Sequence, residues 1–528
     1  MRSTASFSCL AFLLLGLLAW SGCGSDDDDG SGVVIQGGTL IEIADGTLRG
    51  EVDGGARRFL GIPFAAPPVG DLRWRPPQPP RPWTGVLEAN QISAPCAQLE
   101  GLTTPASDTE DCLYLNVWSP DPDPAPAEPL PVMVWFHGGG NTSGSTGDLI
   151  PLGVGGLFYN GRSLAESRDV VIVTTNYRLN IFGFLSHAGL AAEDPSYPFS
   201  GNQALLDQRA ALEWVRDNIA AFGGDPDNVT IFGESAGSFD VCYHVASPLS
   251  RGLFHRAISQ SGGCTTRQTM DDEARQRTVG LIAQTGCDAA PDPLACLRAT
   301  PVSELLALSS GFGPAVDGGF LPDQTRAIFD RGEFAKVPYI LGSNSDEGTL
   351  FFLGTAPIET EAEYVAAVED RYGDRADEVL ALYPVADFDS PNDAWVRISG
   401  DSGLVCGTYD TARRAAAGGA EVYLYNFDWP VLVDVLPELG ATHGAEIAFV
   451  FGSAEAPEPV DEVIAMSMQG YWTRFARHGD PNGGGALEWP RYSDDDDRRI
   501  NFAAENSIVA DFRRPQCEFF WSLYDEEF

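Results

Sequence analysis

The segment NVTIFGESAGS, residues 228–238, places a serine between two glycines where a strand pattern gives way to a helix pattern. Residues 229–232 are β-branched or aromatic, which predicts a buried strand, and a helix is predicted to follow the serine. Gly233 and Gly237 lack the Cβ atoms that so sharp a turn would exclude. The pattern therefore predicts a turn that presents the hydroxyl of Ser235 as a nucleophile.

A serine nucleophile needs a general base, and the base needs a carboxylate to orient it. The chain has six histidines, one of which, His137, lies directly before a glycine run and upstream of the serine. Four are poor candidates because they precede the serine, follow it too closely or end a predicted helix: His187, His244, His255 and His478. His443 lies in a loop between Gly440 and Gly444, which leaves it free to reach across a site. By elimination, His443 is the candidate base.

Two adjacent acids follow another predicted strand in ILGSNSDEG. Asp346 and Glu347 are nearly equal candidates for the orienting carboxylate on the sequence pattern alone. The chain order of serine, acid and histidine is that of α/β-hydrolases.

A third candidate element is the glycine run in VMVWFHGGGNTSG. Gly138, Gly139 and Gly140 follow a predicted strand and let backbone N–H groups approach a developing negative charge. An oxyanion hole also takes the N–H of the residue after the nucleophile, here Ala236.

Predicted strands alternate with predicted helices along the chain, as in the strand at 170–179, the helix at 202–222 and the strand at 256–262. This alternation predicts an α/β fold with a parallel sheet covered on both faces, and such sheets bind ligands at the carboxyl ends of their strands. No internal repeat or long linker interrupts the sequence after Val33. The Pro- and Asp-rich segment 119–131 is interpreted as a surface turn, so residues 33–528 are predicted to form one domain.

The chain of 528 residues is strongly acidic, with 75 acidic and 33 basic residues and a net charge of −42. Nucleic acid is therefore a poor partner, because phosphate contacts need clustered basic side chains. The charge predicts a soluble, self-repelling surface. It is also compatible with adaptation to high salt.

The N-terminus predicts export. Residues 1–22 have the apolar run of a signal peptide, too short to span a bilayer, and residues 23–32 have the composition of an acidic flexible spacer. The segment WSGC resembles a bacterial lipoprotein junction, in which Cys23 would become lipidated and tether the protein to a membrane. Trp20 departs from that pattern, and ordinary secretion is the alternative.

Of the ten cysteines, eight follow Cys9 and Cys23, and an even number in an exported domain predicts disulfides. Cys287 and Cys296 are close enough in sequence to close a short loop. No pair has C-x-x-C spacing, so no zinc site or redox dithiol is predicted, and no metal is expected.

Taken together, these motifs resemble the type B carboxylesterase family, which includes cholinesterases, bacterial esterases such as para-nitrobenzyl esterases, and fungal lipases. The motifs that carry the resemblance occur in family order over nearly the whole mature chain: FLGIPFAAPPVGDLRW, EDCLYLNVWSP, FGGDPDNVTIFGESAG, AVDGGFLPD, NSDEGTLFF and HGAEIAFVFG. The resemblance implies an α/β-hydrolase fold with a large, mostly parallel central sheet flanked by helices, and a serine carboxylesterase that needs no cofactor.

The resemblance also implies site residues. Ser235 would be the nucleophile, His443 the base and Glu347 the acid, because this family characteristically uses glutamate. The oxyanion hole would consist of the N–H groups of Gly139, Gly140 and Ala236. The implied disulfides are Cys96–Cys112, Cys287–Cys296 and Cys406–Cys517, and a fourth bridge between the remaining Cys242 and Cys264 is a hypothesis.

The departures from the family concern the substrate. The segment between Cys96 and Cys112 is short and has no aromatic residue, whereas cholinesterases carry there a tryptophan that binds quaternary ammonium. Choline esters are therefore improbable preferred substrates, and so short a loop argues against a lipase lid. Small or soluble esters are the predicted substrates. The alternatives are a lipase acting on longer-chain esters and a non-catalytic adhesion protein of the same family.

Overall fold

A computed structural model describes residues 38–121, 128–149, 157–433, 436–453 and 459–526. The predictions of a signal peptide, an acidic spacer and a lipidated Cys23 fall on residues 1–32 and lie outside the described residues.

The fold is built on an 11-stranded sheet with the order β16-β15-β14-β13-β10-β9-β7-β8-β6-β4-β3. Neighbouring strands run parallel from β8 through β15, and antiparallel pairs join β3, β4, β6 and β8 on one side and β15 to β16 on the other. The predicted large, mostly parallel sheet is confirmed. Its strands are β3 (Glu51–Asp53), β4 (Ala56–Pro63), β6 (Tyr114–Pro120), β7 (Leu130–Phe136), β8 (Val171–Thr175), β9 (Gly224–Glu234), β10 (Arg256–Gln260), β13 (Tyr339–Asn344), β14 (Val422–Phe427), β15 (Arg498–Phe502) and β16 (Ser507–Ala510).

Two small sheets lie outside the central one. The first has the order β1-β2-β5, from Leu40–Ile43, Gly46–Arg49 and Val86–Glu88. The second pairs β11 (Thr269–Met270) with β12 (Ala315–Val316).

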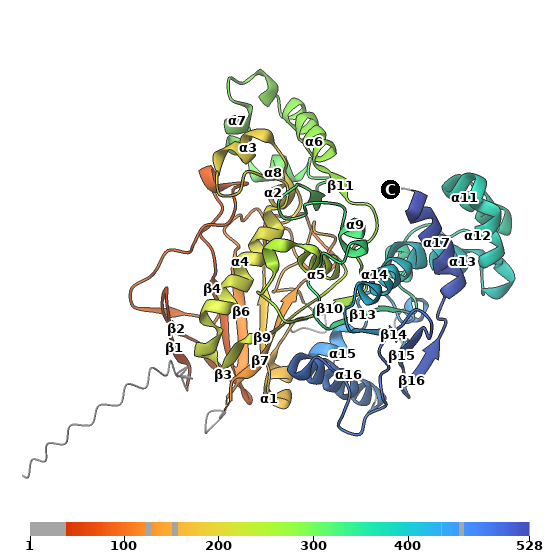
Figure 1. The fold of residues 1–528 in the computed structure, drawn as a ribbon. Helices are drawn as coiled ribbons and strands as arrows, with labels where there is room; N and C mark the ends of the chain where they lie inside the picture. Colours follow the sequence, from red (N-terminus) through yellow and green to blue (C-terminus); the bar gives the residue numbers. More distant parts are fainter. Residues whose placement is uncertain (1–37, 122–127, 150–156, 434–435, 454–458, 527–528) are drawn as a thin grey trace, which may run out of the picture. The chain divides into compact units, whose positions relative to one another are not determined.

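Helices cover both faces of the central sheet (Figure 1). Side chains alternate between the faces of a strand, so that Val134 of β7 belongs to one buried cluster and Trp135 to the other. The Val134 cluster also contains buried side chains of α4 (Gln203–Asn218), α5 (Ala236–Ala246), α14 (Cys406–Ala417) and α17 (Arg514–Glu526). The Trp135 cluster contains those of α1 (Arg162–Arg168), α15 (Ile447–Phe451) and α16 (Pro459–His478).

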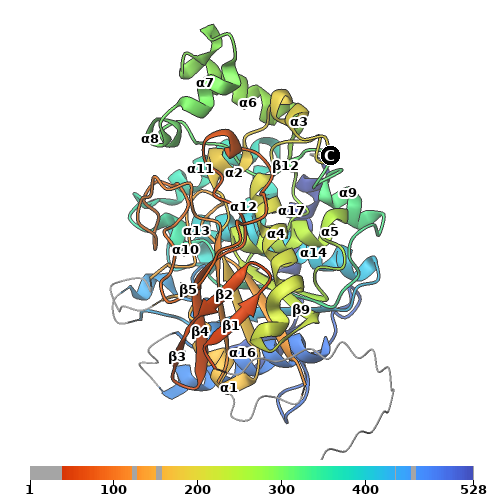
Figure 2. The same cartoon turned by 90° about the vertical axis from the view of Figure 1, so that its left-hand side faces the viewer.

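The remaining α-helices lie mostly in the connections between strands. They are α2 (Asn180–Phe184), α3 (Ala188–Glu193), α6 (Asp271–Gln284), α7 (Pro293–Ala299), α8 (Val302–Leu306), α9 (Thr325–Asp330), α10 (Thr349–Phe352), α11 (Glu361–Tyr372), α12 (Ala376–Leu382) and α13 (Pro391–Gly400). Both views show α6, α7 and α8 grouped at the end of the fold opposite to α1 and α16 (Figures 1 and 2).

The end of the predicted helix at 202–222 shows how sequence sets an element boundary. After α4 the chain tightens into a 3-10 helix, Ile219–Phe222, which stops at Gly223 with a φ of 92°. Glycine adopts this left-handed conformation without the Cβ penalty of other residues. The chain can therefore reverse at once into β9, the strand that leads to Ser235.

Four disulfides cross-link the described residues: Cys96–Cys112, Cys242–Cys264, Cys287–Cys296 and Cys406–Cys517. They are the three pairs that the family resemblance implies and the hypothetical fourth. Disulfides on this scale are typical of exported proteins. None of the helices in the described ranges is both long and apolar enough to cross a membrane.

The turn after β9 leaves no space for a side chain at Gly237, which can be tested by substitution. A Cβ atom at this position would lie 2.0 Å from the carbonyl oxygen of Phe136 on the neighbouring strand. We expect Gly237→Ala to lower the free energy of unfolding by at least about 2 kcal/mol, because backbone must move to admit the methyl group. Chemical denaturation measures the change.

Gly280 in α6 provides the matched control, because a Cβ there would meet nothing within 4 Å. Gly280→Ala should stabilise the protein by about 0.5–1 kcal/mol through helix propensity. Equal stabilities of the two variants would contradict the steric argument.

Candidate active site

The site begins at the turn between β9 and α5. Ser235 has φ 54° and ψ −122° and is the N-cap residue of α5. Positive φ is unfavourable for a residue with a Cβ atom, and such strain persists only where the surroundings impose it. Here the N–H of Ser235 donates a 3.0 Å hydrogen bond to the carbonyl of Gln260, which follows from the parallel pairing of β9 with β10. The serine is therefore held at the carboxyl edge of the sheet.

Glu347 and His443 come from the ends of two neighbouring strands, β13 and β14. A parallel bridge between Asp346 and Thr442 extends the pairing of these strands into the loops that follow. The bridge brings the two side chains together: His443 Nδ1 donates a 2.6 Å hydrogen bond to Glu347 Oε2. Glu347 Oε1 accepts a second one, 2.7 Å long, from the N–H of Asn344.

Asp346, the other candidate acid, is directed elsewhere. Its side chain pairs with Arg397 at 2.8 Å and accepts a 2.9 Å hydrogen bond from the N–H of Ala441. Of the two adjacent acids, therefore, only Glu347 is bonded to His443 in the structure.

The glycine run follows β7, the strand that pairs with β9 on the side away from β10. Gly138 packs directly on the turn, since a Cβ there would lie 3.2 Å from Ser235 Cβ. Gly139 and Gly140 have φ of 104° and 65°. Within the described residues, the N–H groups of Gly139, Gly140 and Ala236 donate no hydrogen bond to other parts of the chain.

No hydrogen bond joins His443 to Ser235 within the described part of the chain. His443 Nε2 is buried without a hydrogen-bond partner there, and the nearest acid oxygen, Glu234 Oε1, lies 3.2 Å away but out of hydrogen-bond alignment. Glu234 directly precedes Ser235, so the free nitrogen of the imidazole lies at the serine turn. Catalytic hydrogen bonds are often long or misaligned before substrate binds.

The comparison with known proteins agrees with this geometry. The model of the carboxylesterase family matches residues 38–520. The chain belongs to the carboxylesterase family.

Two relatives support the assignment of this chain to the carboxylesterase family. Fumonisin B1 esterase of Sphingopyxis macrogoltabida is 38% identical over 464 residues, which cover 84% of this chain and 82% of the relative. Cholinesterase of Mus musculus is 34% identical over 539 residues, covering 92% and 86%. The protein is a carboxylic ester hydrolase, and the alternative of a non-catalytic adhesion protein gains no support.

The carboxylesterase buries two further acids beside His443 that the sequence analysis did not identify. Glu234 is 4% exposed, and Glu446 is fully buried and accepts hydrogen bonds from Asn344 and Gln260. Burial raises the pKa of Glu234 to about 8, with Glu446 and Glu347 acting in the same direction and His443 opposing it. The only sequence signal for either acid was its position, Glu234 beside the serine and Glu446 three residues after the histidine.

The charge state of His443 depends on these acids. Burial lowers its pKa, but Glu234 and Glu347 outweigh burial and raise the pKa to about 9. An imidazole must be neutral to accept a proton from serine. A Glu234 that carries its own proton no longer favours the imidazolium ion, so protonation of Glu234 lowers the pKa of His443 toward the range in which an imidazole can accept a proton.

Three of the four rejected histidines make structural hydrogen bonds instead, and the fourth ends a helix. His187 caps α3, His244 bonds to Ser250 and Gln208, the side chain of His255 accepts the N–H of Val229, and His478 ends α16. Throughout the described ranges, no group of three or more His, Cys, Asp or Glu side chains has an arrangement that holds a metal ion.

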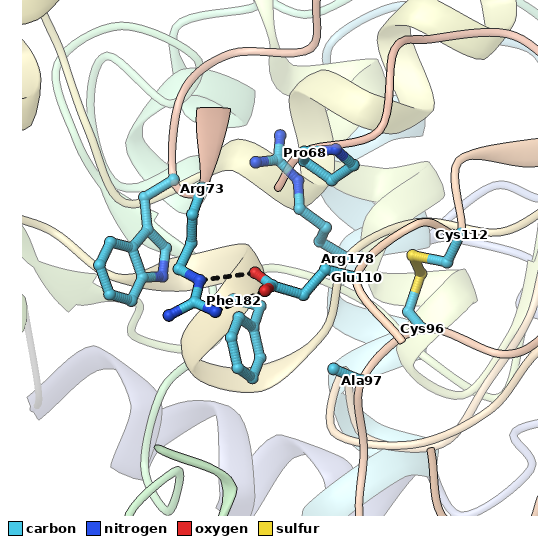
Figure 3. Close-up of a pocket in the computed structure, with 9 residues that line it drawn as sticks. Pro68, Arg73, Cys96, Ala97, Glu110, Cys112, Arg178 and Phe182 are labelled. Carbon is cyan, nitrogen blue, oxygen red and sulfur yellow. Dashed lines mark hydrogen bonds and ion pairs between the residues drawn. A yellow bond between two sulfur atoms is a disulfide. The ribbon is translucent and has the colours of Figure 1, made fainter. Parts of the chain in front are cut away.

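The loop closed by Cys96 and Cys112 packs next to the segment that follows the glycine run. A Cβ on Gly101 would lie 2.8 Å from Ser143, whose N–H donates to the carbonyl of Gly139. The base of the loop is fixed by the disulfide and by an ion pair between Arg73 and Glu110 (Figure 3). The cavity beside them, of about 10 Å³, has room for about one water molecule.

A larger cavity, of about 490 Å³, is lined in part by Glu347. Its lining contains two arginines, Arg397 and Arg513, and both are paired with aspartates. Six acids also line it: Asp346, Glu347, Asp387, Asp389, Asp393 and Glu438. The electrostatic field on this side of the site is therefore unfavourable to anionic molecules.

Replacing Glu234 tests the electrostatic account. In Glu234→Gln the negative charge next to His443 Nε2 is lost, so the imidazolium ion is less favoured and the pKa of His443 should fall by about one or more. Nuclear magnetic resonance of histidine-labelled protein measures it directly.

Asp346→Asn is the control, because Asp346 pairs with Arg397 rather than with His443. It should leave the pKa of His443 unchanged. A His443 that titrates identically in Glu234→Gln and in the wild type would overturn the role given to Glu234.

Proposed function

We propose that this protein is a serine carboxylesterase in which Ser235 is the nucleophile, His443 the general base and Glu347 the orienting acid. The observation that carries the proposal is the 2.6 Å bond between His443 and Glu347, next to the strained turn that holds Ser235. The three residues follow three strands of one parallel run, so they meet at the same edge of the sheet.

In the proposed cycle, His443 Nε2 takes the proton of Ser235 as Oγ attacks the ester carbonyl carbon. The carbonyl oxygen becomes an oxyanion, which accepts hydrogen bonds from the N–H groups of Gly139, Gly140 and Ala236. Collapse of this intermediate breaks the bond to the alcohol oxygen, and the alcohol leaves with the proton from His443.

Water then attacks the acyl-enzyme and gives its proton to His443. The carboxylic acid departs as the bond to Ser235 Oγ breaks, and the proton returns to the serine. Glu347 keeps the Nδ1–H of His443 in place through both halves of the cycle, which leaves Nε2 as the base. Loss of one hydrogen-bond donor from comparable oxyanion holes costs about 2.7–4 kcal/mol of transition-state stabilisation.

Small or soluble neutral esters are the proposed substrates. The loop closed by Cys96 and Cys112 has no aromatic side chain to bind a quaternary ammonium group. A preference for choline, which the name of the mouse relative implies for that protein, is therefore not proposed here. The acid-lined cavity beside Glu347 and the net charge of −42 disfavour anionic esters.

Longer-chain esters are a second candidate, because exposed apolar side chains border the site on two sides. On the side of the glycine run, Leu102 is 72% exposed, and the N–H of Leu149 bonds to the carbonyl of Thr103. On the other side, the Phe351 ring lies 5.0 Å from that of His443 and is 57% exposed. We call this set the apolar rim: Leu102, Leu149 and Phe351.

Substitution of the triad tests the proposed function. Ser235→Ala should lower kcat for p-nitrophenyl butyrate by at least about 10⁴-fold, since the nucleophile is lost. Glu347→Gln should lower it by about 10²–10⁴-fold, because the amide no longer fixes the working tautomer. Asp346→Asn, one residue earlier, should change kcat by less than about threefold. Wild-type turnover in Ser235→Ala would exclude the proposed nucleophile.

The apolar rim predicts a chain-length effect. Leu102→Ser should reduce kcat/KM for p-nitrophenyl octanoate by about 3- to 10-fold and leave the acetate ester unaffected, since only the longer chain reaches the rim. Leu40→Ser, at an exposed leucine of β1, should change neither value. If Leu102→Ser affects both esters equally, the rim does not bind the acyl chain.

A further inference from the structure

The residue after the glycine run continues its unusual backbone. Gly139, Gly140 and Asn141 have φ of 104°, 65° and 57°, and the N–H groups of Thr142 and Ser143 both turn back to the carbonyl of Gly139. Asparagine tolerates the left-handed region better than most residues with a Cβ atom. The run lies outside any helix or strand, so its position depends on what its neighbours hold.

The side chain of Asn141 is hydrogen-bonded to α5, the helix that follows Ser235. Its side-chain Nδ2 donates a 3.0 Å hydrogen bond to Asp240 Oδ1, and both residues are buried, at 5% and 0% exposure. Asp240 lies in α5, whose first residue is Ala236. One side-chain hydrogen bond therefore joins the segment that carries Gly139 and Gly140 to the helix that carries Ala236.

Asp240, whose position is set by α5, also ends a buried polar chain. Gln208 of α4 donates a 2.6 Å hydrogen bond to Asp240 Oδ2 and is bonded through Oε1 to His244, which in turn bonds to Ser250. None of the described cations forms an ion pair with Asp240. Burying an unpaired acid is costly, and burial raises the pKa of Asp240 to about 7. An apolar residue would avoid this cost, which points to a function for the acid.

We propose that Asp240 is a positioning residue that acts through Asn141 to set the spacing between the two halves of the oxyanion hole. The inference rests on the proposed function, in which Gly139 and Gly140 supply one half and Ala236 the other. Donors stabilise an oxyanion only at about 2.7–3.1 Å from where the charge develops. A shift of the loop relative to α5 therefore weakens the transition state more than the bound substrate.

Three variants of the Asn141–Asp240 hydrogen bond distinguish an effect on the oxyanion hole from a loss of protein stability. Asp240→Leu removes both acceptor oxygens, and Asn141→Gly removes the donor while keeping the left-handed backbone. Asp240→Asn retains one acceptor oxygen for Asn141, and Gln208 can rotate its amide to match the new group, so this variant should rescue activity. Gln208→Leu is the matched control, because it breaks the same buried chain without touching Asn141.

We expect Asp240→Leu and Asn141→Gly each to lower kcat per titrated active site by about 10- to 100-fold with KM within about threefold. A trifluoromethyl ketone inhibits by accepting attack from the serine, which gives a hemiketal oxyanion in the oxyanion hole. Its inhibition constant should rise by the same factor. The double variant should lose no more than the worse single variant, because both remove one interaction. Gln208→Leu should lower the melting temperature comparably but change kcat by less than about threefold.

Equal kcat in Asp240→Leu and Gln208→Leu, or additive losses in the double variant, would overturn the inference and leave Asp240 a structural residue. That result is distinct from failure of the proposed function. If the proposed function fails, Ser235→Ala retains activity. If only the further inference fails, Ser235→Ala is inactive but Asp240→Leu lowers kcat no more than Gln208→Leu does.

Discussion

The hydrogen bond between His443 Nδ1 and Glu347 Oε2 is the interaction on which the site depends. It joins residues 96 positions apart, and it forms because β13 and β14 are parallel neighbours whose pairing continues past the strands through Asp346 and Thr442. Parallel strands deliver their carboxyl ends to one edge of a sheet. The same geometry brings the glycine run after β7 and Ser235 after β9 to that edge, so one topology assembles the whole site.

The site concentrates negative charge around a single imidazole. Glu234, Glu347 and Glu446 are all buried near His443, and like charges at short range cannot all remain ionised without cost. The pKa values of Glu234 and Glu446 are raised, so these two carboxyl groups are the ones that hold a proton more readily than an exposed acid does. Asp240 adds a fourth buried acid, in the helix that follows Ser235, where it is bonded to Asn141 rather than to the histidine. Glu234 and Glu347 therefore flank the imidazole, whereas Asp240 is bonded to the segment that follows the glycine run.

Much of the fold and part of the site were predictable from the sequence, because they rest on local rules. The alternation of apolar strands and amphipathic helices predicts a covered parallel sheet, and two glycines around Ser235 predict the turn. Glu234 and Asp240 were not predicted, since an acid inside an apolar segment has no local sign of what it contacts. The choice between Asp346 and Glu347 came from the family resemblance, and the structure gives its physical basis: one side chain faces Arg397 and the other faces His443.

The sequence by itself predicted the sharp turn and the glycine run, because both depend on residue types at short spacing. It also predicted the order of the candidate triad and the membership in the carboxylesterase family, because both depend on the order of motifs along the chain. Only the tertiary structure shows how Glu347 reaches the histidine while Asp346 does not, how the buried carboxylates surround one imidazole and how Asn141 is bonded to α5. Those contacts join residues tens to hundreds of positions apart. Their distances follow from sheet order and side-chain packing, which no local pattern encodes.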